Sequence, residues 1–135
     1  MSDQLYQDTL LKLAKDAPHK GRLDPNDASI RLDNPLCGDR VRIDLRLEGE
    51  RIVDLAHEVR GCILCQAAAG IIGLRAVGLD RQGVADLAEQ VDRMLAGEKP
   101  TISELEAFGP VASHRSRHDC VRLPFQALRE AAKVV

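Results

Sequence analysis

Aromatic side chains are scarce in this sequence. Its 135 residues contain no tryptophan, and the aromatic residues are Tyr6, Phe108 and Phe125. The core must therefore be aliphatic, and platforms on which nucleic-acid bases stack are disfavoured. Basic residues are not in excess either, because 19 lysines and arginines face 21 aspartates and glutamates, for a formal net charge of −2. We therefore expect no nucleic-acid partner, since such partners favour a strongly basic surface.

Long apolar segments are also missing. The first residues, MSDQLYQDTLLKLAKD, are acidic at once and lack the pattern of a secretory signal. No stretch of the sequence approaches the length of a membrane span. We therefore expect a cytoplasmic protein with no membrane partner. In that reducing compartment its four cysteines favour metal binding or catalysis over structural disulfides.

The composition that remains is that of a globular protein, with 44% apolar and 30% charged residues. The length suffices for one domain with a core and is too short for two ordinary domains. We therefore predict that residues 1–135 form a single domain, without repeats or an interdomain linker.

Alternation of apolar and charged residues gives the clearest local signal. It runs through VRIDLRLE at 41–48 and predicts a half-buried strand. Glu48-Gly49-Glu50 supplies a turn, and residues 52–59 return as the second strand of an antiparallel hairpin. A further short strand is predicted at 29–32.

Helical patterns occupy most of the remaining chain. Helices are predicted at 3–16, 62–77, 84–95 and 123–134, with a short one opening at 101–104. Loops rich in proline, glycine or polar residues are predicted at 17–28 and 109–119. The order predicts an α+β fold, a small antiparallel β-sheet of about three strands with several α-helices packed on one face.

The cysteines fall mostly at the ends of the predicted elements. Cys37 precedes the first hairpin strand, Cys62 lies where the second strand passes into a helix, and Cys120 lies at the entry to the last helix. Such positions can be exposed and yet rigidly held, and helix N-termini favour the metal-binding thiolate. Asp39, two residues after Cys37, could add a hard oxygen ligand. Spacing alone leaves open whether these side chains converge.

Simpler interpretations remain for each of these residues. A buried cysteine can be only a small apolar side chain, an interpretation that suits Cys65 inside the apolar helix. Asp39 could be a turn residue, because Cys-Gly-Asp is good turn chemistry. His118 could be a solvated loop residue. The pair Cys62-Ile-Leu-Cys65 is also typical of dithiol redox proteins, although a hairpin rather than a βαβ unit precedes it.

Three motifs together resemble a known family. NPLCGD at 34–39, Gly61-Cys62 at a strand-to-helix junction, and a single cysteine shortly before LPFQAL resemble the iron–sulfur cluster assembly scaffolds of the IscU, SufU and NifU N-terminal group. The resemblance covers nearly the whole chain and implies an α+β domain of that type. It also implies that Cys37, Asp39, Cys62 and Cys120 meet and bind a metal, either in a transient [2Fe–2S] cluster or as Zn²⁺.

The resemblance further implies partners and roles. Sulfur would come from a cysteine desulfurase to Cys62 or Cys120, and the finished cluster would pass to recipient apo iron–sulfur proteins. An aspartate among the ligands of an exposed cluster would weaken its retention, so Asp39→Ala is expected to hold the cluster more tightly. The function expected is that of a scaffold and not of an enzyme in the ordinary sense.

The departures from the family pattern favour the SufU type. IscU-type members have histidine immediately before the third cysteine, whereas Asp119 stands here and His118 comes one residue earlier. GPVASHRSR replaces their proline-rich chaperone-recognition segment, and the long interval from Cys62 to Cys120 is similar to that of SufU-type members. Three alternatives follow: a zinc-containing sulfur acceptor that stimulates the desulfurase, a Cys62/Cys65 dithiol redox protein, and a relative whose zinc only stabilises the fold.

Overall fold

A single antiparallel sheet forms one layer of the protein. The structure, a computed structural model, describes residues 3–36 and 38–133. The sheet has the order β1-β2-β3, in which all neighbours are antiparallel. The elements of the protein are, in chain order, α1 (Asp3–Lys15), β1 (Ala28–Asn34), β2 (Asp39–Glu48), β3 (Arg51–Arg60), α2 (Ile63–Arg75), α3 (Arg81–Leu95), the 3₁₀ segments η1 (Ser103–Ser113) and η2 (Arg115–Arg117), and α4 (His118–Ala132).

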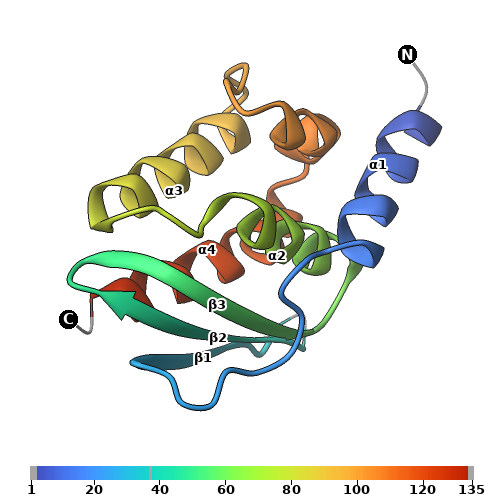
Figure 1. Ribbon diagram of the computed structural model, residues 1–135. Coiled ribbons are helices and arrows are strands. Elements are labelled where there is room, and N and C mark those ends of the chain that lie inside the picture. The colour runs from blue at the N-terminus through green and yellow to red at the C-terminus, as the bar shows by residue number, and fades with distance from the viewer. Residues whose placement is uncertain (1–2, 37, 134–135) are drawn as a thin grey trace.

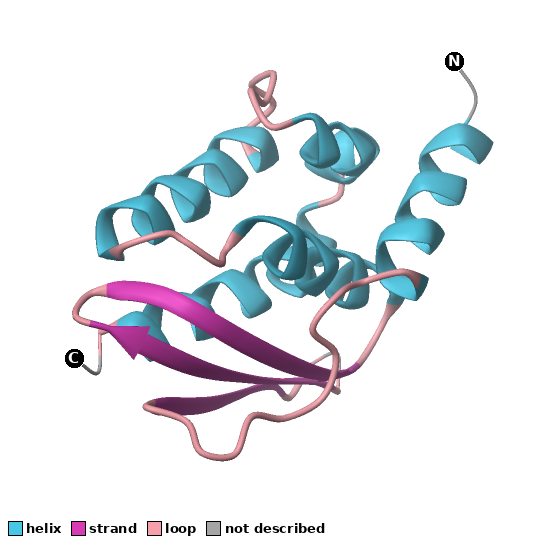
Figure 2. Ribbon diagram, viewed as in Figure 1, coloured by secondary structure: helices cyan, strands magenta, loops and turns pink. Residues whose placement is uncertain are grey.

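The helices gather on one face of the sheet (Figure 1). Helix α4 packs on β1 and β2, and α2 packs on β3. Helices α1 and α3 lie farther out, α1 against α2 and α3 against α4. Figure 2 shows the strands as a layer of their own beneath the helices. The predicted α+β fold, with its small antiparallel sheet and its helices on one face, is confirmed.

The alternation read from the sequence decides which face of the sheet is covered. Val41, Ile43 and Leu45 of β2 point into the core and are fully buried. The hairpin turns at Gly49, whose φ of 62° is a left-handed conformation that suits glycine. The charged residues between the apolar ones therefore lie on the outer face of the sheet.

Two glycines allow α2 to approach the N-terminal part of the chain closely. A Cβ atom at Gly70 would collide with the backbone carbonyl of Leu13, and one at Gly73 with that of Pro18. These glycines lower the intrinsic stability of a helix, but here they permit contact between α2 and the segment that ends α1. The remaining surface of α2 is largely buried in the core.

The edge of β3 is covered by a piece of the loop that follows α1. The amide of His57 donates to the carbonyl of His19 at 2.9 Å, and the amide of Gly21 donates to the carbonyl of His57 at 2.8 Å. Lys20 forms an isolated parallel bridge with His57. The segment at 19–21 therefore occupies the position that a fourth strand would take.

The C-terminal third differs from the prediction. Helix α4 begins at His118 instead of Leu123, and the predicted loop at 109–119 contains 3₁₀ turns and the first residues of α4. The run SHRSRHD lacks apolar periodicity, and Pro124 lies inside the helix, where proline is unfavourable. Packing of the apolar face of α4 on the sheet outweighs both features. Among the described residues, no helix is long and apolar enough to cross a membrane.

Candidate metal centre

Three of the four predicted ligands lie together where elements end. Asp39 is the first residue of β2, Cys62 is the N-cap of α2, and Cys120 is the third residue of α4. One ligand atom from each, the carboxylate oxygen and the two sulfurs, lies within 4.8 Å of the other two. Cys37 lies outside the described residues.

Antiparallel pairing explains how distant residues meet here. In the register of β2 and β3, Arg40 faces Arg60, so the start of β2 lies beside the end of β3. Gly61 and Cys62 continue from that end into α2. Helix α4, which packs on both β1 and β2, brings its first turn to the same place.

Gly61 has a specific role at this junction. A Cβ atom there would collide with the carboxylate of Asp39, so a larger side chain would displace the carboxylate or the strand end. Sequence reasoning noted Gly61 only as part of the Gly-Cys pair. The signal for its role was its place immediately before Cys62, but the contact with Asp39 depends on tertiary structure.

The carboxylate of Asp39 is held by one oxygen and unpaired at the other. Its Oδ1 accepts a hydrogen bond from the backbone N–H of Cys62 at 3.1 Å. Its Oδ2 is buried and has no hydrogen-bond partner among the described residues, although the residue is only 1% exposed. A buried carboxylate oxygen without a partner costs free energy that a bound cation would recover. This orphaned oxygen fits a metal ligand.

The two sulfurs differ in access to solvent. Cys62 is partly exposed, whereas the side chain of Cys120 is 1% exposed. The sequence placed Cys120 at an element end that can be exposed, but the structure buries it, because α4 starts earlier than predicted and places Cys120 in a helical turn against the core. Both cysteines lie at the start of a helix, Cys62 as the N-cap of α2 and Cys120 in the first turn of α4.

The donor set suits the metals that the sequence suggested. Two thiolates and one carboxylate are ligands that Zn²⁺ accepts in a tetrahedral site, and thiolates are the ordinary ligands of iron–sulfur clusters. Asp39, Cys62 and Cys120 would hold either group, with one further position left for another ligand. The sequence predicts that Cys37 is that ligand, and this stays a prediction because Cys37 lies outside the described residues.

The other candidates lie apart from this group. Cys65 is fully buried within α2, where an external disulfide could not reach its sulfur, so the geometry gives little support to a Cys62/Cys65 redox pair. The ring Nε2 of His118 lies 3.2 Å from the carbonyl oxygen of Val111 and 3.1 Å from that of Ala112. That histidine therefore ties η1 to the start of α4 and is not a solvated loop residue.

Comparison with known proteins places the chain in a family. Residues 5–132 match the family described as the NifU-like N terminal domain. Because this match spans most of the sequence, the chain belongs to that family.

Curated relatives and a solved structure agree with this assignment. The chain is 30% identical to the iron–sulfur cluster assembly scaffold protein IscU of Streptococcus pyogenes serotype M1, over 97% of this chain and 84% of that protein. It is 27% identical to the zinc-dependent sulfurtransferase SufU of Bacillus subtilis (strain 168), over 95% of this chain and 89% of that protein. The crystal structure of a nitrogen-fixing NifU-like protein (N-terminal) from Brucella abortus superposes with a TM-score of 0.90 at 26% identity, covering 98% of this chain and 94% of that one.

Proposed function

We propose that this protein is a scaffold on which a [2Fe–2S] cluster is assembled and from which it is transferred. The observation that carries the proposal is the meeting of Asp39, Cys62 and Cys120 within 4.8 Å, with a buried carboxylate oxygen that has no partner among the described residues. Cys37 would complete the ligand set. Family membership supports this function, because a curated relative is named as an assembly scaffold.

Sulfur would reach the site by persulfide exchange with a cysteine desulfurase. The thiolate of Cys62 or Cys120 attacks the terminal sulfur of the desulfurase persulfide, the sulfur–sulfur bond there breaks, and the desulfurase cysteine leaves as a thiolate. One new sulfur–sulfur bond replaces the old one, so this exchange needs no external oxidant or reductant. Incorporation of the sulfur into a cluster as sulfide then takes two electrons per sulfur atom, which a thiol reductant such as excess cysteine supplies. Cys62 is the more accessible acceptor, since it is partly exposed and Cys120 is buried.

The surroundings of the site suit contact with a protein partner. Leu36, one residue before Cys37, is 91% exposed, and Ile63, one residue after Cys62, is also exposed. Apolar side chains left in solvent beside a functional site are typical of protein contact surfaces. We assign this rim to the desulfurase and to the recipient apo iron–sulfur proteins, and we place these exchanges in the cytoplasm.

A zinc-dependent sulfur acceptor is the second candidate for the same site. Two thiolates and a carboxylate are all ligands that Zn²⁺ accepts, and the relative from Bacillus subtilis is named as a zinc-dependent sulfurtransferase. In this version Asp39, Cys62 and Cys120 would hold Zn²⁺, which would order the site, and one of the two cysteines would take up the incoming sulfur. The protein would then carry sulfur on a cysteine and would not hold an iron–sulfur cluster.

One anaerobic experiment separates the two functions. The protein is incubated with a cysteine desulfurase, cysteine and ferrous iron while visible absorbance and cysteine turnover are followed, and bound iron, sulfide and zinc are then measured. A charge-transfer spectrum with iron and sulfide on the protein supports the scaffold. Faster turnover with retained zinc and no chromophore supports the sulfur acceptor and excludes the scaffold. A large loss of Tm on chelation, with no response to the desulfurase, would leave only a structural zinc site.

Matched cysteine variants test the ligand set. Cys37→Ser, Cys62→Ser and Cys120→Ser should each lose metal, because serine replaces a thiolate that binds zinc or iron with a neutral hydroxyl. Cys65→Ser is the control and should retain metal, because Cys65 lies outside the group of converging ligands. Unchanged metal content in both Cys62→Ser and Cys120→Ser would refute the proposed centre.

A further inference from the structure

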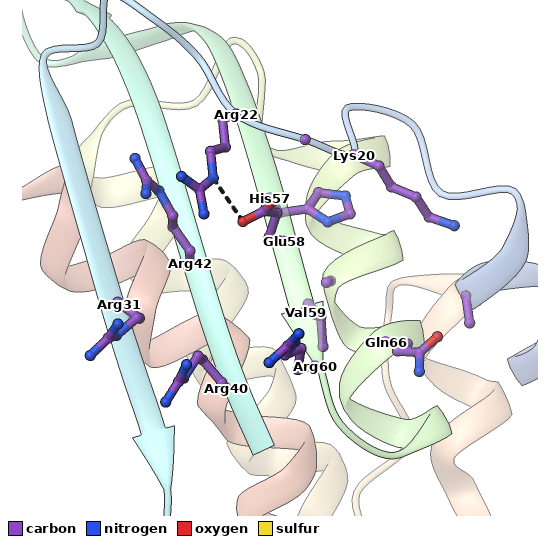
Figure 3. Close-up of a pocket in the computed structure, with 13 residues that line it drawn as sticks. Lys20, Arg22, Arg31, Arg40, Arg42, His57, Glu58, Val59, Arg60 and Gln66 are labelled. Atoms are coloured by element: carbon purple, nitrogen blue, oxygen red, sulfur yellow. Dashed lines mark hydrogen bonds and ion pairs between the residues drawn. The ribbon is translucent and has the colours of Figure 1, made fainter. Parts of the chain in front are cut away.

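The uncovered face of the sheet carries a concentration of arginines that the net charge conceals. Figure 3 shows Arg31 on β1, Arg40 and Arg42 on β2, and Arg60 at the end of β3. Arg22, from the loop between α1 and β1, lies beside them. They line part of a depression of about 760 Å³. We call these five arginines the basic face.

The strand register sets arginines directly opposite one another. Arg31 pairs with Arg42 across β1 and β2, and Arg40 pairs with Arg60 across β2 and β3. Side chains in such pairs have Cβ atoms about 5 Å apart, and like charges there are destabilising. The protein therefore tolerates an electrostatic cost at two points of one surface.

The nearby carboxylates relieve only part of this charge. Arg22 pairs with Glu58 at 2.9 Å, Arg40 with Asp33 at 3.0 Å and Arg42 with Asp44 at 2.9 Å. In residues 3–36 and 38–133, no ion pair involves Arg31 or Arg60. The basic face therefore has unused capacity to bind carboxylates.

We infer that the basic face is a docking surface for an acidic protein. Arginine presents a planar group that binds carboxylates with two parallel hydrogen bonds, and it is enriched at protein interfaces. The long side chains stand on an open sheet and not in a walled, apolar cleft of the kind that holds small molecules. Charge complementarity therefore selects an acidic surface as the occupant.

Nucleic acid fits this surface less well. Among the described residues that line the depression none is tryptophan, tyrosine or phenylalanine, so bases would find nothing aromatic on which to stack. The whole chain is also slightly negative, which weakens long-range attraction to a phosphate backbone.

The basic face adjoins the candidate metal centre. Arg40 directly follows Asp39, and Arg60 precedes Cys62 by two residues. An acidic partner seated there would have its edge next to the site. The inference rests on the charges and the strand register, and it stands independently of which metal the site holds.

The test measures binding of a peptide of alternating glutamate and serine to the ¹⁵N-labelled protein by NMR. The peptide should shift the amides of β1, β2 and β3, and Arg31→Gln/Arg60→Gln should weaken its affinity about tenfold. The matched control is Arg129→Gln/Lys133→Gln, which removes the same charge from exposed positions at the end of α4. The control should change the affinity less than about twofold.

Three results would overturn the inference. An equal loss in both double variants would mean that only net charge matters. Tighter binding of a single-stranded oligothymidylate of matched charge would assign the surface to nucleic acid. Saturation of the same amides by inorganic pyrophosphate, with displacement of the peptide, would assign it to small anions.

Thermal unfolding provides a readout that needs no partner. Arg31→Gln should raise Tm by about 1–3 °C because it removes one side of a like-charge pair. Arg129→Gln should leave Tm nearly unchanged. A lower Tm for Arg31→Gln would mean that Arg31 stabilises the fold, which would contradict the inferred repulsion between Arg31 and Arg42.

Discussion

Two buried aspartates on the same strand have opposite surroundings. Asp44 is 0% exposed and accepts hydrogen bonds from Ser29 Oγ at 2.6 Å, Arg42 Nε at 2.9 Å and the amide of Leu23 at 3.1 Å. Asp39 is 1% exposed and accepts one hydrogen bond, from the amide of Cys62, while its Oδ2 has no partner in the part of the chain that the structure describes. Burial is thus the same for both, and only the partners distinguish them.

The difference separates a carboxylate that the fold itself satisfies from one that retains an oxygen for a ligand. Asp44 links the loop before β1 to β1 and β2, and its charge is satisfied by the fold itself. Asp39 is held by one oxygen beside two cysteine sulfurs, so its remaining bonding capacity is available to something outside the chain. Because Asp39 and Asp44 are equally buried on the same strand, each serves as a control for substitution of the other.

The largest effect is expected for Asp44→Ala. It would leave the hydroxyl of Ser29, the amide of Leu23 and the guanidinium of Arg42 without their acceptor, at a cost of about 3 kcal/mol in the free energy of unfolding. Urea denaturation measures this loss. Asp33→Ala, which removes an exposed ion pair with Arg40, is the control and should cost less than about 1 kcal/mol. Equal losses in the two variants would contradict the structural role of Asp44.

Acid should produce the next largest effect, in two separate pH windows. Burial lowers the pKa of His57 below 6.5, and the positive charges of Lys20 and His19 lower it further, while the hydrogen bond to the carbonyl of Pro18 opposes them. The unfolded chain therefore binds a proton first, and stability that is present above pH 6.5 is lost as pH falls through the folded pKa. The loss is at most about 1.4 kcal/mol for each unit of pKa difference.

Asp44 should lose its contribution only in stronger acid. Burial raises its pKa, but the hydrogen bonds from Ser29, Arg42 and Leu23 outweigh burial and hold the pKa below 3.8. Its stabilisation is therefore complete above pH 3.8 and falls as pH drops through the folded pKa. Urea midpoints measured across the pH range test both windows. His57→Gln should flatten only the upper window, and a change confined to the lower one would contradict this assignment.

The smallest effect on stability is expected for Asp39→Ala. The variant loses the hydrogen bond from the amide of Cys62 but also removes a buried oxygen without a partner, so the metal-free protein should change by less than about 1 kcal/mol. Its effect should appear at the site, where an assembled [2Fe–2S] cluster should be released to an acceptor protein more slowly. Urea denaturation and the rate of cluster transfer check the two halves. A loss as large as that of Asp44→Ala would mean that Asp39 is also structural.

Local patterns were sufficient to predict most elements of the fold. The alternation in β2 is strict, and α3 has a clear apolar stripe, so both were predicted within a few residues of their observed ends. The start of α4 was missed because its first residues are polar and only packing on the sheet makes them helical. The hydrogen bonds of His118 to Val111 and Ala112, which fix that start, join residues whose contact no local pattern specifies.

The members of the candidate site could be named from the sequence, but their geometry could not. The motifs around Cys62 and Cys120 directed attention to residues that the structure brings together, since thiols at helix starts have a chemical meaning of their own. The burial of Cys120 and the unpaired oxygen of Asp39 arise from packing between distant segments. The basic face was missed for a related reason: a net charge of −2 says nothing of how arginines on three strands line up.

The loop segment at 19–21 also affects how molecules of this protein meet one another. It satisfies the backbone N–H and C=O of His57 at the free edge of β3, so another molecule's strand cannot pair with β3 at that residue. Growth of the sheet is left to β1, an edge strand of seven residues. Covering an edge with a loop is one of the means by which proteins avoid joining edge to edge into aggregates. A loop that seems only to connect α1 to the sheet thus helps to keep neighbouring molecules apart at high concentration.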